Sequence, residues 1–136
     1  MQIEYVKELP SLEDYKMLRD AVGWGYSDDA SMQNGINGSC YSVLAKSEGK
    51  TIGMGRVFGD GGAFFIVADI VVIPEFQQKG MGKIIVRMIV EWLKNNCPKN
   101  GRVWLFAAKG RESFYEQFGF FRRPTEDFGA GMQLDI

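Results

Sequence analysis

Apolar residues recur at two different spacings along the chain, and the change from one spacing to the other predicts an α/β fold. Alternation over residues 2–7 predicts a short first strand. Apolar residues at helical spacing after Ser11, a suitable N-cap, predict a helix that ends at Gly23. Residues 23–40 are polar and rich in turn residues, so we expect a long loop there, with a short helix near residues 29–34.

The middle of the chain is typical of an antiparallel meander followed by a crossover. Strands are expected at residues 41–47, 51–58 and 63–73, separated by two turns. The third strand is apolar on both faces in its second half, which predicts a central strand covered by helices on at least one side. A helix is expected after Gly82. It leads to a strand at residues 102–108 that should be parallel to the third strand.

The last part of the chain predicts a short helix that begins after Gly110 and is closed by Gly119. Two final strands are expected at residues 120–123 and 128–134, joined by a turn at the intervening proline. The element order is that of a mixed sheet flanked by helices. The length of 136 residues predicts a single domain over residues 1–136.

Composition narrows the function classes. The net charge of −1 does not favour nucleic acid or an anionic membrane surface, and no apolar run approaches the roughly 18 residues of a membrane span. Cys40 and Cys97 match no metal-binding spacing, and the start of the sequence does not resemble a signal peptide. We therefore expect reduced, buried thiols, no metal and a cytoplasmic protein. Because the chain has no histidine, any general base must be a carboxylate, a tyrosine, a lysine, a terminus or a water relay.

A glycine-rich turn between the third strand and the following helix predicts an anion site. Gly80 and Gly82 let the backbone approach a ligand closely, and the N–H groups of the first helical turn point outward. A P-loop is excluded because Ile84 stands where a hydroxyl residue is needed. A dinucleotide-binding turn is excluded because Ile85 stands where a third small residue is needed. A glycine-rich turn without any ligand is the alternative.

Two motifs in this chain resemble those of the GCN5-related N-acetyltransferase family, and they occur in the same order. Residues Gln77 to Gly82 resemble the family's pyrophosphate loop, Gln/Arg-x-x-Gly-x-Gly/Ala. The resemblance extends back over residues 69–76, which are similar to the fourth strand of the family. It extends forward to residues 113–120, which are similar to its Phe-Tyr-Glu-Lys-x-Gly-Phe segment. The predicted element order also matches, so the resemblance covers essentially the whole chain and implies that family's fold.

The resemblance implies that the protein binds acetyl-CoA as its acyl donor. The pyrophosphate would lie on the N–H groups of the loop. The pantetheine arm would pair with the strand at residues 70–72, where that strand separates from the one at residues 104–106. The cofactor-binding residues implied are Ile70, Val71, Val72, Gln77, Gln78, Lys79, Gly80, Met81, Gly82, Lys83, Ser113 and Tyr115. The asparagine that many relatives carry before the tyrosine helix is absent here, so Lys109 or Ser113 would replace its contact.

The resemblance also implies catalytic roles. Tyr115 would protonate the leaving thiolate, and a backbone N–H of Val71 or Val72 would stabilise the oxyanion. The alternative for Tyr115 is simple packing against neighbouring aromatic rings. Asp69 is a candidate general base, but a carboxylate in so apolar a strand needs a partner, so a hydrogen bond to a neighbouring loop is the alternative. A water relay to Glu75 is a further option.

The acceptor side is expected in the loop that follows the first helix. Trp24 and Tyr26 are candidates for a substrate wall, and the alternative is that Trp24 fills the core at the end of the helix. Asp28 and Asp29 beside them would favour a cationic or arylalkyl amine, or are simply solvated. The expected function is acetyl transfer from acetyl-CoA to a primary amine of a small molecule, or of a peptide or protein, by direct attack in a ternary complex. The alternative is a non-catalytic acyl-CoA sensor, and a homodimer is left open.

Overall fold

The computed structural model describes residues 2–136 and contains two compact units, divided after Phe106. The first unit holds most of the secondary structure. Its elements are β1 (Ile3–Val6), α1 (Leu12–Ala21), α2 (Asp29–Asn37), β2 (Tyr41–Ser47), β3 (Lys50–Gly59), β4 (Phe64–Val72), the 3-10 turn η1 (Pro74–Phe76), α3 (Met81–Asn96) and β5 (Arg102–Leu105). The second unit contains α4 (Glu112–Glu116).

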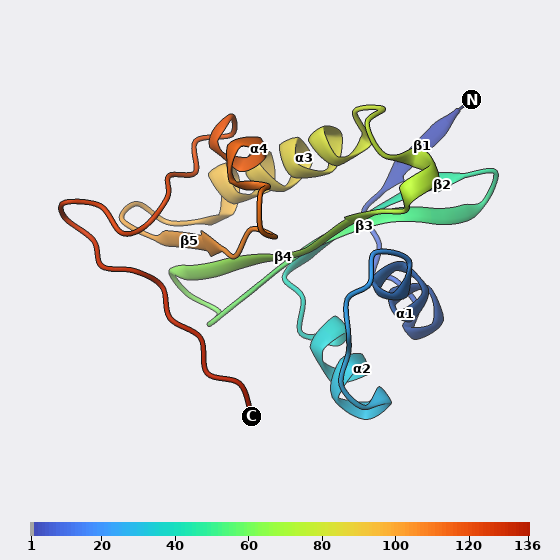
Figure 1. The fold of residues 1–136 in the computed structure, drawn as a ribbon, viewed down its shortest axis with the longest axis horizontal. Coiled ribbons are helices and arrows are strands. Elements are labelled where there is room, and N and C mark those ends of the chain that lie inside the picture. The colour runs from blue at the N-terminus through green and yellow to red at the C-terminus, as the bar shows by residue number, and fades with distance from the viewer. Residues whose placement is uncertain (1) are drawn as a thin grey trace. The chain divides into compact units, whose positions relative to one another are not determined.

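The strands form one five-stranded sheet in the order β1-β2-β3-β4-β5. Neighbouring strands are antiparallel except β4 and β5, which are parallel, so the predicted crossover through α3 is confirmed. In the first unit α3 covers one face of the sheet and α1 and α2 lie on the other (Figure 1). β4 therefore lies between helical layers, which is why both of its faces carry apolar residues.

Each helix follows from a local signal in the sequence. α1 begins at Ser11, whose side chain accepts a hydrogen bond from the Asp14 N–H at 3.1 Å. α2 begins where the short helix was expected, because Asp28 caps it by accepting from the Ser31 N–H at 2.8 Å, but it continues to Asn37 and not only to residue 34. α3 is the most amphipathic of these helices, and its buried stripe packs on the sheet through Ile85, Val86, Ile89 and Leu93.

A β-bulge interrupts the pairing of β3 and β4. Met54 pairs with Val71 and Arg56 pairs with Ala68, so Gly55 alone lies opposite two residues, Asp69 and Ile70. Asp69 takes a φ of +55°, which is rare for a residue with a side chain. Gly55 makes room for the bulge, since a Cβ at this position would meet the Ile70 Cδ1 atom at 2.7 Å. The apolar pattern of β4 predicts the strand but gives no sign of the extra residue.

The prediction of two final strands is wrong. In residues 107–136, all of which the structure describes, neither 120–123 nor 128–134 forms a strand. The Thr125 N–H donates to the Phe128 C=O at 2.8 Å, and the rings of Phe121 and Phe128 stack at 5.8 Å, but no ladder forms between the two segments. Alternation alone does not make a strand, because a ladder needs a partner edge for its N–H and C=O groups.

Candidate active site

The site begins where β4 extends beyond the end of its parallel partner, β5. The β4–β5 register runs from Phe64 opposite Arg102 to Val67 opposite Leu105, where β5 ends, whereas β4 continues to Val72. Over Ala68–Val72, the edge of β4 that faces away from β3 has no paired strand among the described residues. The predicted separation of the two strands is confirmed. Such an edge presents main-chain donors and acceptors to an extended ligand.

The free edge leads through η1 to the glycine-rich turn, which the sequence predicts to be an anion site and which we call the anion loop. Gln78 and Gly80 adopt left-handed conformations, with φ of +62° and +83°, and α3 begins at the next residue, Met81. The first hydrogen bond along α3 is donated by the Ile84 N–H to the Gly80 C=O, at 3.2 Å. The N–H groups at residues 81–83 therefore have no acceptor within the helix, and they stand at the positive end of its dipole.

The side chains of this loop have separate tasks. Gln77 donates from Nε2 to the Val72 C=O at 2.8 Å and so ties the loop to the end of β4. Lys79 and Lys83 are exposed and can add positive charge, whereas the Met81 side chain is buried and only its backbone can face a ligand. The loop can therefore hold a phosphate group mainly through main-chain groups, as the sequence predicts.

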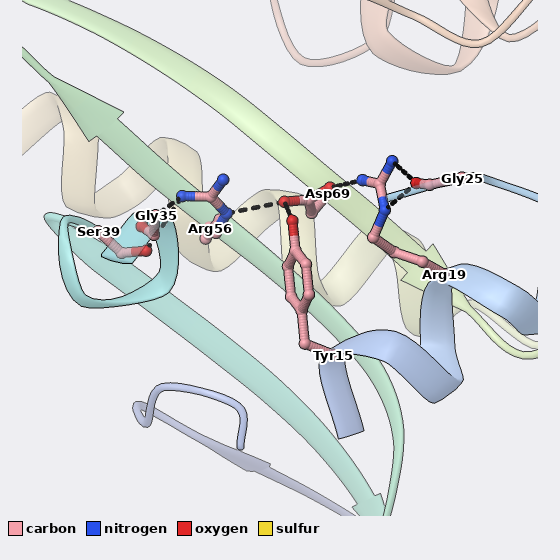
Figure 2. Close-up of polar contacts among 7 residues, drawn as sticks. All are labelled: Tyr15, Arg19, Gly25, Gly35, Ser39, Arg56 and Asp69. Carbon is pink, nitrogen blue, oxygen red and sulfur yellow. Dashed lines mark hydrogen bonds and ion pairs between the residues drawn. The ribbon is translucent and has the colours of Figure 1, made fainter. Parts of the chain in front are cut away.

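Asp69, at the bulge, is the centre of a buried polar cluster (Figure 2). Its side chain is only 6% exposed. Oδ1 accepts from Arg19 Nη1, and Oδ2 accepts from Arg56 Nε at 2.7 Å and from the Tyr15 hydroxyl at 2.8 Å. Of the two alternatives for this residue, the structure shows the hydrogen-bonded one, although the donors come from α1 and β3 and not from a loop. We call Tyr15, Arg19, Arg56 and Asp69 the Asp69 cluster.

The two arginines extend the cluster to the segments around α2. Arg19 also donates to the Gly25 C=O, through Nε at 2.8 Å and through Nη2. Arg56 Nη1 donates to the Gly35 C=O at 3.2 Å and to Ser39 Oγ at 3.3 Å. Burial and then the neighbouring carboxylate raise the pKa of Tyr15, while the two guanidiniums oppose that shift. The phenol therefore stays a hydrogen-bond donor to Asp69.

Sequence reasoning missed the three partners of Asp69. One signal was available for two of them, because Tyr15 and Arg19 are four residues apart and so share a face of α1. That face is the buried one, and an arginine there needs a carboxylate. Arg56 gives a similar signal, since it interrupts the apolar β3 strand.

The predicted acceptor wall is only partly as expected. Trp24 packs against the core cluster of α1, α2 and the sheet, and the Arg19 guanidinium lies 5.4 Å from its ring centroid. Tyr26 is 43% exposed, and its hydroxyl donates to Asp20 at 3.2 Å beside a surface hollow of about 450 Å³. Asp28 caps α2, and Asp29 pairs with Lys16 at 2.9 Å. Both acids therefore have partners within the protein, and their selection of the amine stays a prediction.

The second unit holds Tyr115 and Ser113, and we describe it by itself. Tyr115 is half-buried on α4, with edge-to-face contacts to Phe114 at 5.0 Å and Phe120 at 6.3 Å. Burial raises the pKa of Tyr115, and the positive charge of Arg111 opposes this shift. Ser113 Oγ accepts a hydrogen bond from Arg122 at 3.2 Å.

Cys40 is exposed and Cys97 is half-buried, so the prediction that both thiols are buried is wrong. No group of three or more cysteine, aspartate or glutamate side chains in residues 2–136 is arranged to hold a metal ion. In the same residues, no helix has both the length and the apolar character to cross a membrane.

Comparison with known proteins relates this geometry to a family. The family model described as "Acetyltransferase (GNAT) domain" matches residues 38–122, which include the free strand edge, the anion loop and α4. A probable acetyltransferase from meticillin-resistant Staphylococcus aureus, whose structure is known, is 30% identical and superimposes with a TM-score of 0.89. That match covers 99% of this chain and 100% of the other.

Two curated relatives are longer than this chain. The uncharacterized N-acetyltransferase ycf52 of Pyropia yezoensis is 27% identical over 84% of this chain and 67% of its own length. The chloroplastic GCN5-related N-acetyltransferase 2 of Arabidopsis thaliana is 32% identical over 72% of this chain and 35% of its own length. Both the family match and the fold agree with the parallel strand pair and the loop described above, and the chain belongs to the GNAT family of acetyltransferases.

Proposed function

We propose that this acetyltransferase moves an acetyl group from acetyl-CoA to the amine of a small molecule by direct attack in a ternary complex, with residues 1–136 acting as one catalytic domain. One observation carries the proposal. The unpaired edge of β4 at residues 68–72 is joined through η1 to the anion loop at the start of α3. The pantetheine arm of acetyl-CoA carries two amides that can pair with the main-chain groups of this edge, and the pyrophosphate joined to it can lie on the N–H groups of the loop.

The cofactor-binding residues divide between these two parts. Ile70, Val71 and Val72 pair through their backbones with the pantetheine amides. The N–H groups of residues 78–83 hold the pyrophosphate, and Lys79 and Lys83 add charge. Gln77 acts indirectly, because its amide is already bonded to Val72 and fixes the loop beside the strand. Ser113 is proposed as an additional contact from the second unit.

The chemistry needs a neutral amine, a stabilised oxyanion and a protonated leaving group. An alkyl amine with a pKa near 10.4 costs about 4–5 kcal/mol to deprotonate at pH 7. Of the two predicted oxyanion donors, Val71 and Val72, we propose the N–H of Val72. The Ile73 N–H donates to the Ile52 C=O on β3, and successive N–H groups of a strand point to opposite edges, so the Val72 N–H faces the free edge. Tyr115 is the proposed acid for the thiolate. Burial raises its pKa, which keeps the phenol protonated and able to donate a hydrogen bond but makes complete transfer of the proton less favourable.

The acceptor is proposed to carry an apolar or aromatic body. α3 covers one face of the sheet at β4 and α1 contacts the other, so we propose that the amine reaches the free edge on the α1 side, past the Asp69 cluster. On the same side of the sheet as the Asp69 cluster, the alternation of the strands places four apolar side chains: Phe58, Phe64, Ile66 and Trp104. The Phe64 side chain is 46% exposed, and its ring stacks on that of Trp104 at 5.5 Å. These rings favour a flat apolar group over a polycation. Trp24 and Tyr26 remain the proposed wall on the α1 side.

A thiol-release assay with acetyl-CoA and a panel of arylalkyl amines, polyamines and peptide amines tests the proposal. Acetyl transfer to at least one amine, lowered by Tyr115→Phe, is expected. The competing function is an acyl-CoA sensor on the same fold. Saturable acetyl-CoA binding without release above background, unchanged by Tyr115→Phe, would contradict the proposed activity and support the sensor.

A further inference from the structure

We propose that Asp69 is a positioning residue, which holds the β4 bulge in the geometry needed for acetyl transfer and does not accept the proton of the amine. The inference rests on the proposed function, since it concerns how the oxyanion donor beside the bulge is fixed. Three observations lead to it: the conformation of Asp69, the saturation of its carboxylate and the origin of its three donors.

The backbone and the side chain of Asp69 lie in different surroundings. The backbone lies on the free stretch of β4, at a φ of +55° that a residue with a side chain rarely adopts. The side chain points to the face covered by α1 and is 6% exposed. A strained conformation of this kind persists only when its surroundings over-determine it. The three hydrogen bonds to the carboxylate supply that constraint (Figure 2).

The carboxylate is poorly suited to act as a base. Both of its oxygens already accept hydrogen bonds, and two of the three donors are guanidiniums, which keep their charge throughout the pH range of proteins. A proton on Asp69 would leave Arg19 and Arg56 facing each other without their shared counter-charge in a largely buried site. A base also needs a free path to the amine, whereas Tyr15 OH occupies part of this carboxylate.

The donors connect the bulge to the acceptor side of the first unit. Arg19 reaches from α1 to the Gly25 C=O, next to Trp24, and Arg56 reaches from β3 to the Gly35 C=O near the end of α2. One carboxylate therefore ties the bulge to two segments that flank the proposed acceptor face. A shift of either segment is transmitted to the peptide groups at residues 69–71, where a misplacement of about 1 Å can cost roughly 100-fold in rate.

Asp69→Asn provides the main test, because the amide keeps the size of the side chain and removes its charge. We measure kcat and KM with two acceptors of similar shape, an alkylamine and a hydrazine whose pKa lies below the assay pH. Positioning predicts that kcat falls by the same factor, about 10- to 100-fold, for both acceptors, with little change in the KM for acetyl-CoA. A defect confined to the alkylamine would show that Asp69 is the base and overturn the proposal.

A purely structural role predicts a different result. In that case the thermal midpoint of Asp69→Asn would fall while kcat per folded molecule stayed at the wild-type value, and the proposal would be overturned. Asp135→Asn, an exposed aspartate in the second unit, is the matched control and should leave all of these quantities unchanged. If Asp69→Asn does not fold, Tyr15→Phe removes one of the three hydrogen bonds without changing the charge, and the same comparison of the two acceptors applies.

A double variant tests the role of the net charge of the Asp69 cluster. Asp69→Asn leaves two guanidiniums without a carboxylate, whereas the double variant Arg56→Gln/Asp69→Asn restores the original net charge of the cluster. We expect the double variant to recover part of the lost kcat. A kcat at or below that of Asp69→Asn would contradict the charge-balanced positioning described here.

One readout separates this proposal from the proposed function. Amide hydrogen exchange at residues 69–71, measured without any substrate, should be at least several-fold faster in Asp69→Asn than in the wild-type protein, because the bulge loses its constraint. Unchanged exchange there would overturn the positioning role even in an active enzyme. A third outcome is faster exchange in Asp69→Asn together with a wild-type protein that transfers no acetyl group. That outcome would retain the role of Asp69 in holding the bulge and reject the proposed function.

Discussion

The anion loop and the Asp69 cluster flank the same stretch of β4, yet they hold their backbone in place by opposite means. The loop is exposed, uses two left-handed residues, and offers main-chain N–H groups at a helix start. The cluster is largely buried and depends on charged side chains from α1, β3 and β4. The difference suggests that changes in the loop alter cofactor affinity with little effect on the fold, whereas changes in the cluster alter stability and turnover.

The largest effect is expected in the cluster, from Arg56→Met. The substitution removes one of two cations that neutralise a buried carboxylate, and breaking such an arrangement typically costs about 3–5 kcal/mol of unfolding free energy. Denaturant unfolding measures the loss. Lys46→Met, which breaks an exposed pair with Glu8, is the control and should cost less than about 1 kcal/mol. Equal losses in the two variants would remove the distinction between buried and exposed charge on which the comparison depends.

Tyr115 gives the next largest effect, and the pH dependence of the rate tests its proposed role as the acid. Tyr115→Phe should lower kcat by roughly 100-fold, within the range of general acid catalysis. Because burial raises the pKa of Tyr115, the phenol stays protonated at and beyond its ordinary value near 10. The wild-type kcat should therefore not fall on the alkaline side before pH exceeds about 10. A fall near pH 8 in the rate profile would assign the acid to another group.

The loop is tested by Gly80→Ala, with Gly61→Ala as a matched control. Both glycines have nearly the same φ, +83° and +82°, and neither Cβ would meet an atom within 4 Å. Each variant should therefore lose about 1–2 kcal/mol from backbone strain. We expect only Gly80→Ala to weaken acetyl-CoA binding, by about 10-fold in titration calorimetry. A similar loss of affinity in Gly61→Ala would show that strain, and not the loop, is responsible.

The smallest effect concerns the acceptor face. Phe64→Ala removes an exposed ring that stacks on Trp104, so the KM for an arylalkyl amine should rise several-fold while the KM for a short alkyl amine stays the same. Phe121→Ala, an exposed ring in the second unit, is the control. An unchanged KM for the arylalkyl amine would place the acceptor elsewhere.

The two regions also differ in how far the sequence predicts them. The loop could be predicted because its signals lie within one short stretch, from the end of an apolar strand to a glycine-marked helix start. The Asp69 cluster could not, since Tyr15 and Arg19 lie about 50 residues before their partner and meet it only through packing of α1 on the sheet. The bulge escaped prediction for a related reason, because one extra residue does not disturb a strand that is apolar on both faces.

The final strands were predicted wrongly on local grounds. Residues 128–134 alternate in the way a strand requires, but alternation describes only the faces of a strand and says nothing of its partner. The three strands of the meander were predicted to within one residue at each end, since their hairpins are marked by turns and each strand has an adjacent partner. The strand expected at residues 102–108 instead ends at Leu105.

The most direct test of the account is a crystal structure with acetyl-CoA bound. The account predicts that the pantetheine amides pair with the backbone of residues 70–72 and that the pyrophosphate lies on the N–H groups at the start of α3. The carboxylate of Asp69 should remain bonded to Tyr15, Arg19 and Arg56. A cofactor bound away from the free edge of β4, or an Asp69 side chain turned from its arginines toward the thioester, would contradict it.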